Sequence, residues 1–161
     1  MGNKQKQLMH SNNNSNSSKA TIRLACVEDV PALTRLSEEL GYAAREDDIA
    51  NRLMELINDN EHIIYTAVLP TGHVVGWIHG IIRKLLIVPA HIELGGLVVQ
   101  NGYQGQGIGT KLLNAVEKWG SLHGIKTIFV RSNEIRKKAH LFYQKHGYQI
   151  IKKSLSFTKE L

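Results

Sequence analysis

The chain has 161 residues, enough for one domain, and its 20 Lys and Arg against 14 Asp and Glu give a net charge of +6. Half of that excess comes from three lysines in residues 1–20, a segment of mostly Asn, Ser, Gln and Lys that we expect to be a disordered tail. The other basic residues form no dense stripe interleaved with aromatics, so a nucleic-acid partner is not favoured. A mildly basic domain equally suits a polyanionic small ligand.

The single cysteine, Cys26, excludes an intrachain disulfide, and we expect it to be a buried structural thiol. No apolar run approaches the roughly 18–20 residues of a membrane span, and the polar first 20 residues do not resemble a secretory signal. These features predict a cytoplasmic protein with no membrane partner. No metal site is expected, because His140 and His146 are six residues apart and no Cys-x-x-Cys or His-Glu-x-x-His motif occurs.

The pattern of apolar residues predicts one folded domain over residues 21–161. Alternating apolar residues from Ile22 to Cys26 predict a first strand. Asp29, two residues before a proline, is a helix-start signal, and Gly41 is placed to close that helix in the left-handed conformation. Apolar residues at helical spacing over 49–57 predict a second helix.

Two β-rich runs follow, 62–69 and 73–85, and the Pro-Thr-Gly turn between them predicts a hairpin. A further strand is expected over 92–99. An amphipathic helix begins near Gly107 and is followed by a short buried strand, 125–130. The strand-helix-strand unit formed by these last three elements implies a parallel crossover.

The C-terminal part predicts a last helix around residues 139–146, closed by Gly147, and two short strands within 148–161. The expected order is therefore β-α-α-β-β-β-α-β-α-β-β. Hairpin-linked strands are antiparallel and the crossover pair is parallel, so the sequence predicts a mixed α/β fold with a central sheet flanked by helices.

The most informative segment is residues 104–110, Gln-Gly-Gln-Gly-Ile-Gly-Thr, between an apolar strand and an amphipathic helix. Alternate glycines let the backbone turn sharply and approach a ligand. N–H groups and the helix dipole favour an anion there, so the segment predicts a cradle for phosphate or pyrophosphate. A Walker loop requires Lys after its second Gly, where Ile108 stands, and a dinucleotide fingerprint requires Gly at Thr110. A kinase loop would lie between paired strands rather than at the start of a helix. The segment therefore fits none of these three phosphate-binding loops well.

Residues 93–109, ELGGLVVQNGYQGQGIG, resemble the core motif of the GNAT superfamily of N-acetyltransferases. Gln104, Gly107 and Gly109 match its three defining positions, and the resemblance extends over about residues 21–161. It implies a GNAT-like fold and an enzyme that moves acetyl from acetyl-coenzyme A directly to an amine, with a homodimer as a possible assembly. The rival interpretation is a non-catalytic sensor that binds acyl-coenzyme A in the same cleft.

The resemblance also implies which residues hold the donor. The strand backbone would hold the pantetheine arm, and this role falls to Leu97, Val98 and Val99. Backbone N–H groups and one hydroxyl would hold the pyrophosphate, and this role falls to Gln104, Gly105, Gln106, Gly107, Ile108, Gly109 and Thr110. Gly95 and Gly96 fall where the strand is expected to bulge and open the cleft for the thioester.

A second segment, residues 131–148, resembles the family's other coenzyme-A segment through Ala139, Tyr143 and Gly147. Either Asn133 or Arg136 would contact the cofactor. The resemblance places Tyr143 at the position of the family's general acid. A phenol with a pKa near 10 can protonate a departing thiolate, so the residue type suits that role. The alternative is that Tyr143 only packs against its helix neighbours.

The base that removes the proton from the substrate ammonium is less clearly marked. Glu93 on the central strand is the first candidate, although it could equally be an exposed strand carboxylate. His91 and His79 are alternatives, but each fits an ordinary strand residue better than a base. The acceptor amine cannot be read from the sequence. Acidic residues over 46–48 would attract a cationic amine, but they equally suit a helix start.

Overall fold

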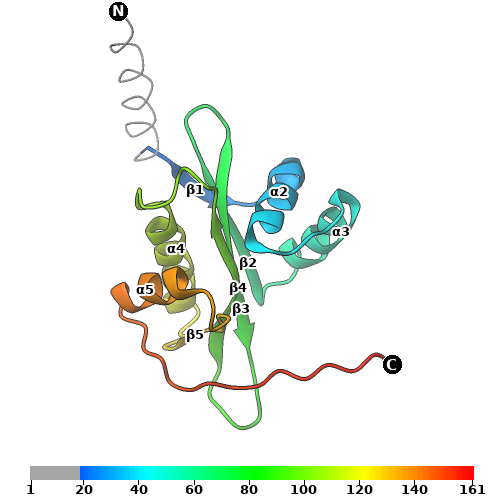
Figure 1. The fold of residues 1–161 in the computed structure, drawn as a ribbon. Helices are drawn as coiled ribbons and strands as arrows, with labels where there is room; N and C mark the ends of the chain where they lie inside the picture. The colour runs from blue at the N-terminus through cyan, green and yellow to red at the C-terminus, as the bar shows by residue number, and fades with distance from the viewer. Residues whose placement is uncertain (1–18) are drawn as a thin grey trace, which may run out of the picture. The chain divides into compact units, whose positions relative to one another are not determined.

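The computed structural model describes residues 19–161 as two compact units, one ending at Val130 and the other covering Arg131–Leu161. The predicted tail, 1–20, lies outside the described residues except for its last two positions. The elements of the first unit are β1 (Thr21–Leu24), the short 3-10 helix η1 (Val27–Asp29), α2 (Val30–Leu40), α3 (Glu46–Ile57), β2 (His62–Val68), β3 (Val74–Arg83), β4 (His91–Val99), α4 (Ile108–Leu122) and β5 (Ile128–Val130) (Figure 1).

The five strands form one sheet in the order β1-β2-β3-β4-β5. All neighbours pair antiparallel except β4 and β5, which pair parallel around the α4 crossover. The predicted hairpin and crossover are therefore confirmed, and so is the mixed α/β class. The hairpin and the crossover follow from the alternation of apolar residues and from the position of the turn glycines.

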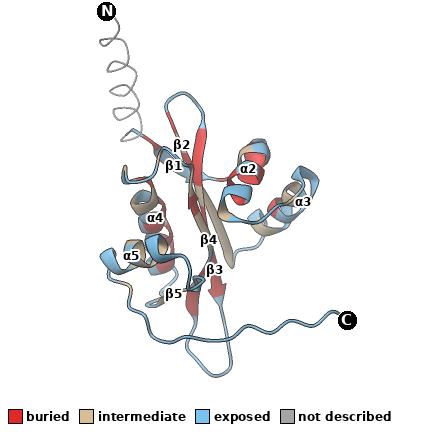
Figure 2. Cartoon of the chain, viewed as in Figure 1, coloured by how far each residue is buried: buried red, intermediate tan, exposed pale blue. Residues whose placement is uncertain are grey.

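Helix α4 covers one face of the sheet, and α2 and α3 cover the other (Figure 1). Residues of β3 alternate between the two layers. A Cβ at Gly80 would touch Val116 and Trp119 of α4, whereas Trp77 packs among residues of the opposite layer. The fully buried residues lie in α2, β2, β3, β4 and α4. Figure 2 colours the buried parts of the sheet and of its covering helices red.

The second unit contains α5 (Lys137–Lys145), which is followed by Gly147 at φ 84°. The expected two closing strands are not formed, because residues 148–161 have no regular secondary structure. The large apolar side chains of this segment are exposed, namely those of Ile150, Ile151, Leu155, Phe157 and Leu161. A strand needs a hydrogen-bonding partner as well as a suitable sequence, and among the described residues none pairs with this segment.

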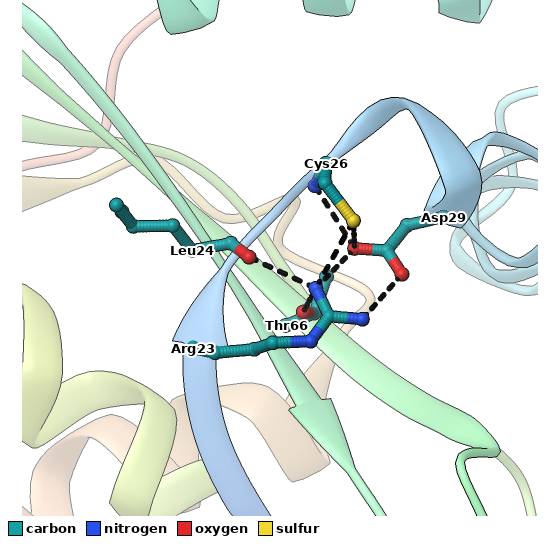
Figure 3. Close-up of polar contacts among 5 residues, drawn as sticks. All are labelled: Arg23, Leu24, Cys26, Asp29 and Thr66. Carbon is teal, nitrogen blue, oxygen red and sulfur yellow. Dashed lines mark hydrogen bonds and ion pairs between the residues drawn. The ribbon is translucent and has the colours of Figure 1, made fainter.

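The junction between β1 and α2 is held by a buried carboxylate. Asp29 is only 3% exposed and receives two hydrogen bonds from Arg23, with N–O distances of 2.6 and 2.7 Å (Figure 3). The backbone N–H of Cys26 donates a third, at 3.0 Å, and Arg23 also reaches the Thr66 hydroxyl of β2 at 3.2 Å. Asp29 therefore does more than begin a helix: its side chain ties β1, the start of α2 and β2 together.

This arrangement makes the stability of the fold depend on pH. Burial acts to raise the pKa of Asp29, but the hydrogen bonds from Arg23 and from the Cys26 N–H outweigh it, so the pKa lies below its ordinary value of 3.8. A carboxyl group with a lowered folded-state pKa stabilises the fold fully above its unfolded-state pKa, and this contribution disappears as the pH falls through the folded-state value.

We predict that Asp29→Asn lowers the free energy of unfolding at neutral pH by about 1–3 kcal/mol, the typical cost of losing hydrogen bonds to a charged group. In urea unfolding, the difference from the parent protein should shrink as the pH drops below 3.8. Asp47→Asn is the matched control, because Asp47 pairs with Arg45 at 3.3 Å on the surface and its loss should cost little. Equal losses in the two variants would contradict a structural role for the Arg23–Asp29 pair.

Candidate active site

The glycine-rich loop lies between the end of β4 and the start of α4. Three of its glycines, Gly102, Gly105 and Gly107, have φ of 87°, 75° and 80°, in the left-handed region that favours glycine. A Cβ at any of the three would meet nothing within 4 Å. Gly107 is the N-cap of α4, whose first N–H groups have no intrahelical acceptors. The loop thus presents bare backbone at a positive helix end, a geometry that fits a pyrophosphate.

Two glutamine side chains hold this loop in shape. Gln104 donates from its amide to the Val99 carbonyl at 2.9 Å and to the Asn101 side chain at 3.3 Å, which fastens the loop to the end of β4. Gln106 donates to the Gly102 carbonyl at 2.9 Å, while its Oε1 is buried and has no hydrogen-bond partner among the described residues. A buried acceptor of this kind normally has a partner, and a donor on a bound ligand would supply one.

Strand β4 is paired on both edges for only part of its length. Its contact with β5 ends where Leu94 meets Val130, whereas its contact with β3 continues to Val99. Leu97, Val98 and Val99 therefore have one edge that no described strand covers. An extended amide-bearing chain can add to such an edge as an extra strand would.

The same strand carries a bulge where its open edge begins. Gly96 pairs with His79 and Leu94 with Gly80, so Gly95 is an extra residue in β4. Both glycines face the layer of α2 and α3. A Cβ at Gly96 would lie 2.6 Å from the Trp77 ring, and one at Gly95 would lie 2.9 Å from Nδ1 of His79. Only glycine fits at both positions.

The three predicted base candidates have different surroundings. Glu93 forms an ion pair with Arg83 at 3.2 Å, and its side chain is 15% exposed. His91 is buried with its ring edge-on to Phe129, and its Nδ1 lies 3.1 Å from the Pro89 carbonyl. His79 lies at the bulge, where its Nε2 is 2.9 Å from Nδ1 of His62.

The second unit holds the other predicted site residues. Tyr143 of α5 is half-buried between Phe142 and Tyr148, with ring centroids 5.4 and 5.5 Å away. Burial raises the pKa of Tyr143, although the charge of Arg136 opposes this, so the phenol is protonated at neutral pH. The Asn133 side chain accepts a hydrogen bond from the Ile135 N–H at 3.1 Å in a local turn, whereas Arg136 is exposed at the N-cap of α5.

Comparison with known proteins places this geometry in a family. The model of the acetyltransferase (GNAT) family matches residues 27–148, about three quarters of the chain. The chain belongs to the GNAT family. A Salmonella typhimurium aminoalkylphosphonate N-acetyltransferase is 32% identical over 146 residues, which cover 87% of this chain and 90% of the relative. A Stenotrophomonas maltophilia aminoglycoside N(6')-acetyltransferase is 27% identical over 145 residues, 88% of this chain and 94% of the relative.

The fold agrees with that assignment. The solved structure of the aminoglycoside N-acetyltransferase AAC(6')-Iy in complex with CoA superposes with a TM-score of 0.80 at 16% identity, over 88% of this chain and 95% of that one. As a GNAT protein the chain is an acetyltransferase whose donor is acetyl-coenzyme A. Over residues 19–161, no group of three or more His, Cys, Asp or Glu is placed to hold a metal ion. No helix in the same range has the length and apolar character to cross a bilayer.

Sequence reasoning did not find the rings of Trp77 and His79 over the GNAT bulge, or the contact of His79 with His62. The signal was present, because β2, β3 and β4 form consecutive hairpins and a register count brings His62, His79 and Gly96 near one another. The extra residue at Gly95 shifts the β3–β4 register by one residue. The alternation of apolar residues alone does not show where such a bulge lies, so the pairing could not be predicted.

We predict that Gly107→Ala abolishes most of the rise in melting temperature that acetyl-coenzyme A produces, because a Cβ enters the open surface of the cradle. The matched control is Gly72→Ala in the β2–β3 turn, where φ is 85° and a Cβ would likewise meet nothing within 4 Å. Both variants carry the same backbone strain, so the two free proteins should lose similar stability. A ligand at a hundred times its Kd stabilises by about 2.7 kcal/mol, and only the control should retain this. If acetyl-coenzyme A raised the melting temperature equally in both variants, the pyrophosphate would not bind at this loop.

Proposed function

We propose that this chain transfers acetyl from acetyl-coenzyme A directly to a primary amine of a small molecule, without a covalent enzyme intermediate. The observation that carries the proposal is the order of features along one strand. The glycine-rich cradle follows the end of β4, the uncovered edge over residues 97–99 comes before it, and the bulge at Gly95 and Gly96 lies at the other end of that edge. This order matches a ligand with a pyrophosphate, an amide-bearing arm and a reactive thioester.

The dimensions are consistent with that arrangement. A strand rises about 3.3 Å per residue, so the backbone from Val99 back to Gly96 spans about 10 Å. An extended pantetheine arm that begins at the cradle and follows this edge brings the thioester to the bulge. The N–H of Val98 or Val99 would then stabilise the oxyanion that forms when the amine attacks.

Tyr143 is the proposed general acid. Its phenol is protonated at neutral pH, because burial raises the pKa, and its hydroxyl has no hydrogen-bond partner among residues 19–161. It is therefore able to donate a proton to a departing sulfur. Arg136, with its exposed guanidinium, is the better candidate for a phosphate contact than Asn133, whose side chain serves a local turn. Glu93 stays a predicted base, but its ion pair with Arg83 competes with that role.

The acceptor class rests on the relatives. The aminoalkylphosphonate and aminoglycoside enzymes named above share one feature in their acceptors, an amine on a small molecule, and we propose the same for this chain. Exposed Glu46, Asp47 and Asp48 at the start of α3 favour a cationic acceptor. We further propose a cytoplasmic location, in keeping with a lone cysteine and no disulfide.

The test is release of free coenzyme A from acetyl-coenzyme A with a panel of amines, including aminoalkylphosphonates, aminoglycosides and polyamines. We predict amine-dependent release of thiol with at least one class, accompanied by an acetylated amine in mass spectrometry. Calorimetric titration of acetyl-coenzyme A is run in parallel. Tight binding without turnover on any amine would favour the acyl-coenzyme A sensor over the enzyme.

We predict that Tyr143→Phe lowers turnover by roughly 10²-fold, a loss of transition-state stabilisation of about 2.7 kcal/mol. Binding of acetyl-coenzyme A should change only a few-fold, because the substitution removes one oxygen and keeps the ring. Tyr65→Phe is the matched control, since Tyr65 of β2 is also half-buried and burial raises its pKa, yet it has no predicted role. If Tyr143→Phe turns over within two-fold of the parent, water protonates the thiolate and Tyr143 only packs.

A further inference from the structure

Two histidines on neighbouring strands form a hydrogen-bonded pair that ends at the β4 bulge. Nδ1 of His62 on β2 lies 2.9 Å from Nε2 of His79 on β3, and the two ring centroids are 5.1 Å apart. Each neutral imidazole has one donor and one acceptor nitrogen, so one ring donates to the other. A proton can therefore pass from one ring to the other along this bond.

The two outer nitrogens of the pair face different surroundings. Nδ1 of His79 points at the bulge, where it lies 2.9 Å from the position of a Cβ on Gly95, and it has no hydrogen-bond partner among residues 19–161. Nε2 of His62 lies 3.8 Å from a carboxylate oxygen of Asp59. The inner end of the pair thus adjoins the bulge, beside which the thioester is proposed to lie, and the outer end lies near a carboxylate.

The outer end also opens into a cavity of about 440 Å³, which is lined in part by Asp59, Asn60, His62 and His123. The cavity lies where β1 ends at Leu24 and leaves the first residues of β2 beyond its reach. The Asp59 side chain is 51% exposed, so water reaches this end of the pair.

We propose that His79 is the catalytic base that takes the proton from the acceptor ammonium, and that His62 passes this proton on to Asp59 and the water of the cavity. The proposal deepens the acetyl transfer proposed above and rests on it, because it needs the thioester at the bulge. It assigns His79 to the reacting amine and His62 to a relay position behind it.

The protons and bonds balance with one tautomer of the pair, in which Nε2–H of His79 donates to Nδ1 of His62. The ammonium gives a proton to Nδ1 of His79, His79 gives its Nε2 proton to His62, and His62 gives its Nε2 proton to Asp59 or water. The neutral amine then forms the C–N bond to give the tetrahedral oxyanion, and collapse of the oxyanion breaks the C–S bond. The second proton of the nitrogen replaces the one that Tyr143 gives to sulfur, and no group is oxidised or reduced.

The charged groups around the two histidines favour passing a proton outward over keeping it on His79. Burial, then the neighbouring His62 and Arg83, lowers the pKa of His79 to about 4, so its ring is neutral at neutral pH and its free nitrogen can accept a proton. Arg83 is itself neutralised by Glu93 across the β3–β4 pair, and Lys84 by Glu61. Asp59 is thus the acid placed next to His62. Glu93, engaged with Arg83, is less available to an incoming ammonium.

The test compares two acceptor amines that differ in the need for a base. A strongly basic alkylamine is almost fully protonated at neutral pH, whereas trifluoroethylamine is largely neutral. We expect His79→Gln to lose about 10²-fold in kcat/KM with the first amine and only a few-fold with the second. Acetyl-coenzyme A should still raise the melting temperature of the variant, which shows that it is folded and binds the donor.

His62→Ala tests the relay separately. It should show the same dependence on the amine, and imidazole should restore activity in a concentration-dependent way, because the substitution enlarges a cavity of about 440 Å³ that is open to solvent. His123→Gln is the matched control: His123 lines the same cavity but bonds the Trp119 carbonyl at 2.9 Å and not the pair. It should retain activity with both amines.

Two results would overturn the proposal. One is an equal loss with both amines in His79→Gln, which would make His79 a support for the strand. The other is an amine-dependent loss in Glu93→Gln and none in His79→Gln, which would make Glu93 the base. Failure of the proposed function is a distinct result, because the parent protein would then bind acetyl-coenzyme A and release no thiol with any amine.

Discussion

The packing of two aromatic rings on two consecutive glycines of β4 is the constraint on which the rest of the site depends. Trp77 covers Gly96 and His79 covers Gly95, each so closely that a Cβ would overlap the ring. Two neighbouring residues can face the same side of a sheet only through a bulge. The bulge marks the point at which β4 continues beside β3 without β5, and so begins the uncovered edge. Trp77 keeps its Nε1 buried without a partner among the described residues, at a cost of about 1–3 kcal/mol that the fold accepts here.

The C-terminal end of helix α2 packs against the β4 bulge. Asp29 fixes the start of the helix against β1 and β2, and Gly41 at φ 101° ends it. Leu40, the last residue of α2, lies 3.6 Å from the position of a Cβ on Gly96. Helix α2 therefore runs from the Arg23–Asp29 ion pair at its start to a contact with the bulge at its end.

The sequence was sufficient for most of the fold because its signals are local. Glycine and proline positions and the periodicity of apolar residues indicate each α-helix and strand of the first unit but not the short helix η1, and the glycine spacing over 104–110 indicates the cradle. Local signals do not show which side chains meet across strands. Asp29 reads as a helix start, yet its carboxylate binds Arg23 six residues back. Gln104 is predicted to contact the ligand through its backbone N–H, and the sequence does not show that its side chain also holds the end of β4. The last 14 residues have the composition of strands, but composition does not supply a partner.

Cys26 has a consequence for the redox chemistry of the protein. Burial, together with the neighbouring carboxylates of Glu28 and Asp29, raises the pKa of this thiol above its ordinary value. Only the thiolate attacks a disulfide, so the one cysteine of the chain is a slow partner in thiol–disulfide exchange. An acetyltransferase of this family releases coenzyme A, a thiol that oxidises to a disulfide. A raised thiol pKa leaves less thiolate on Cys26 to attack that oxidised product, so a mixed disulfide at the β1–α2 junction forms more slowly than at an ordinary exposed cysteine.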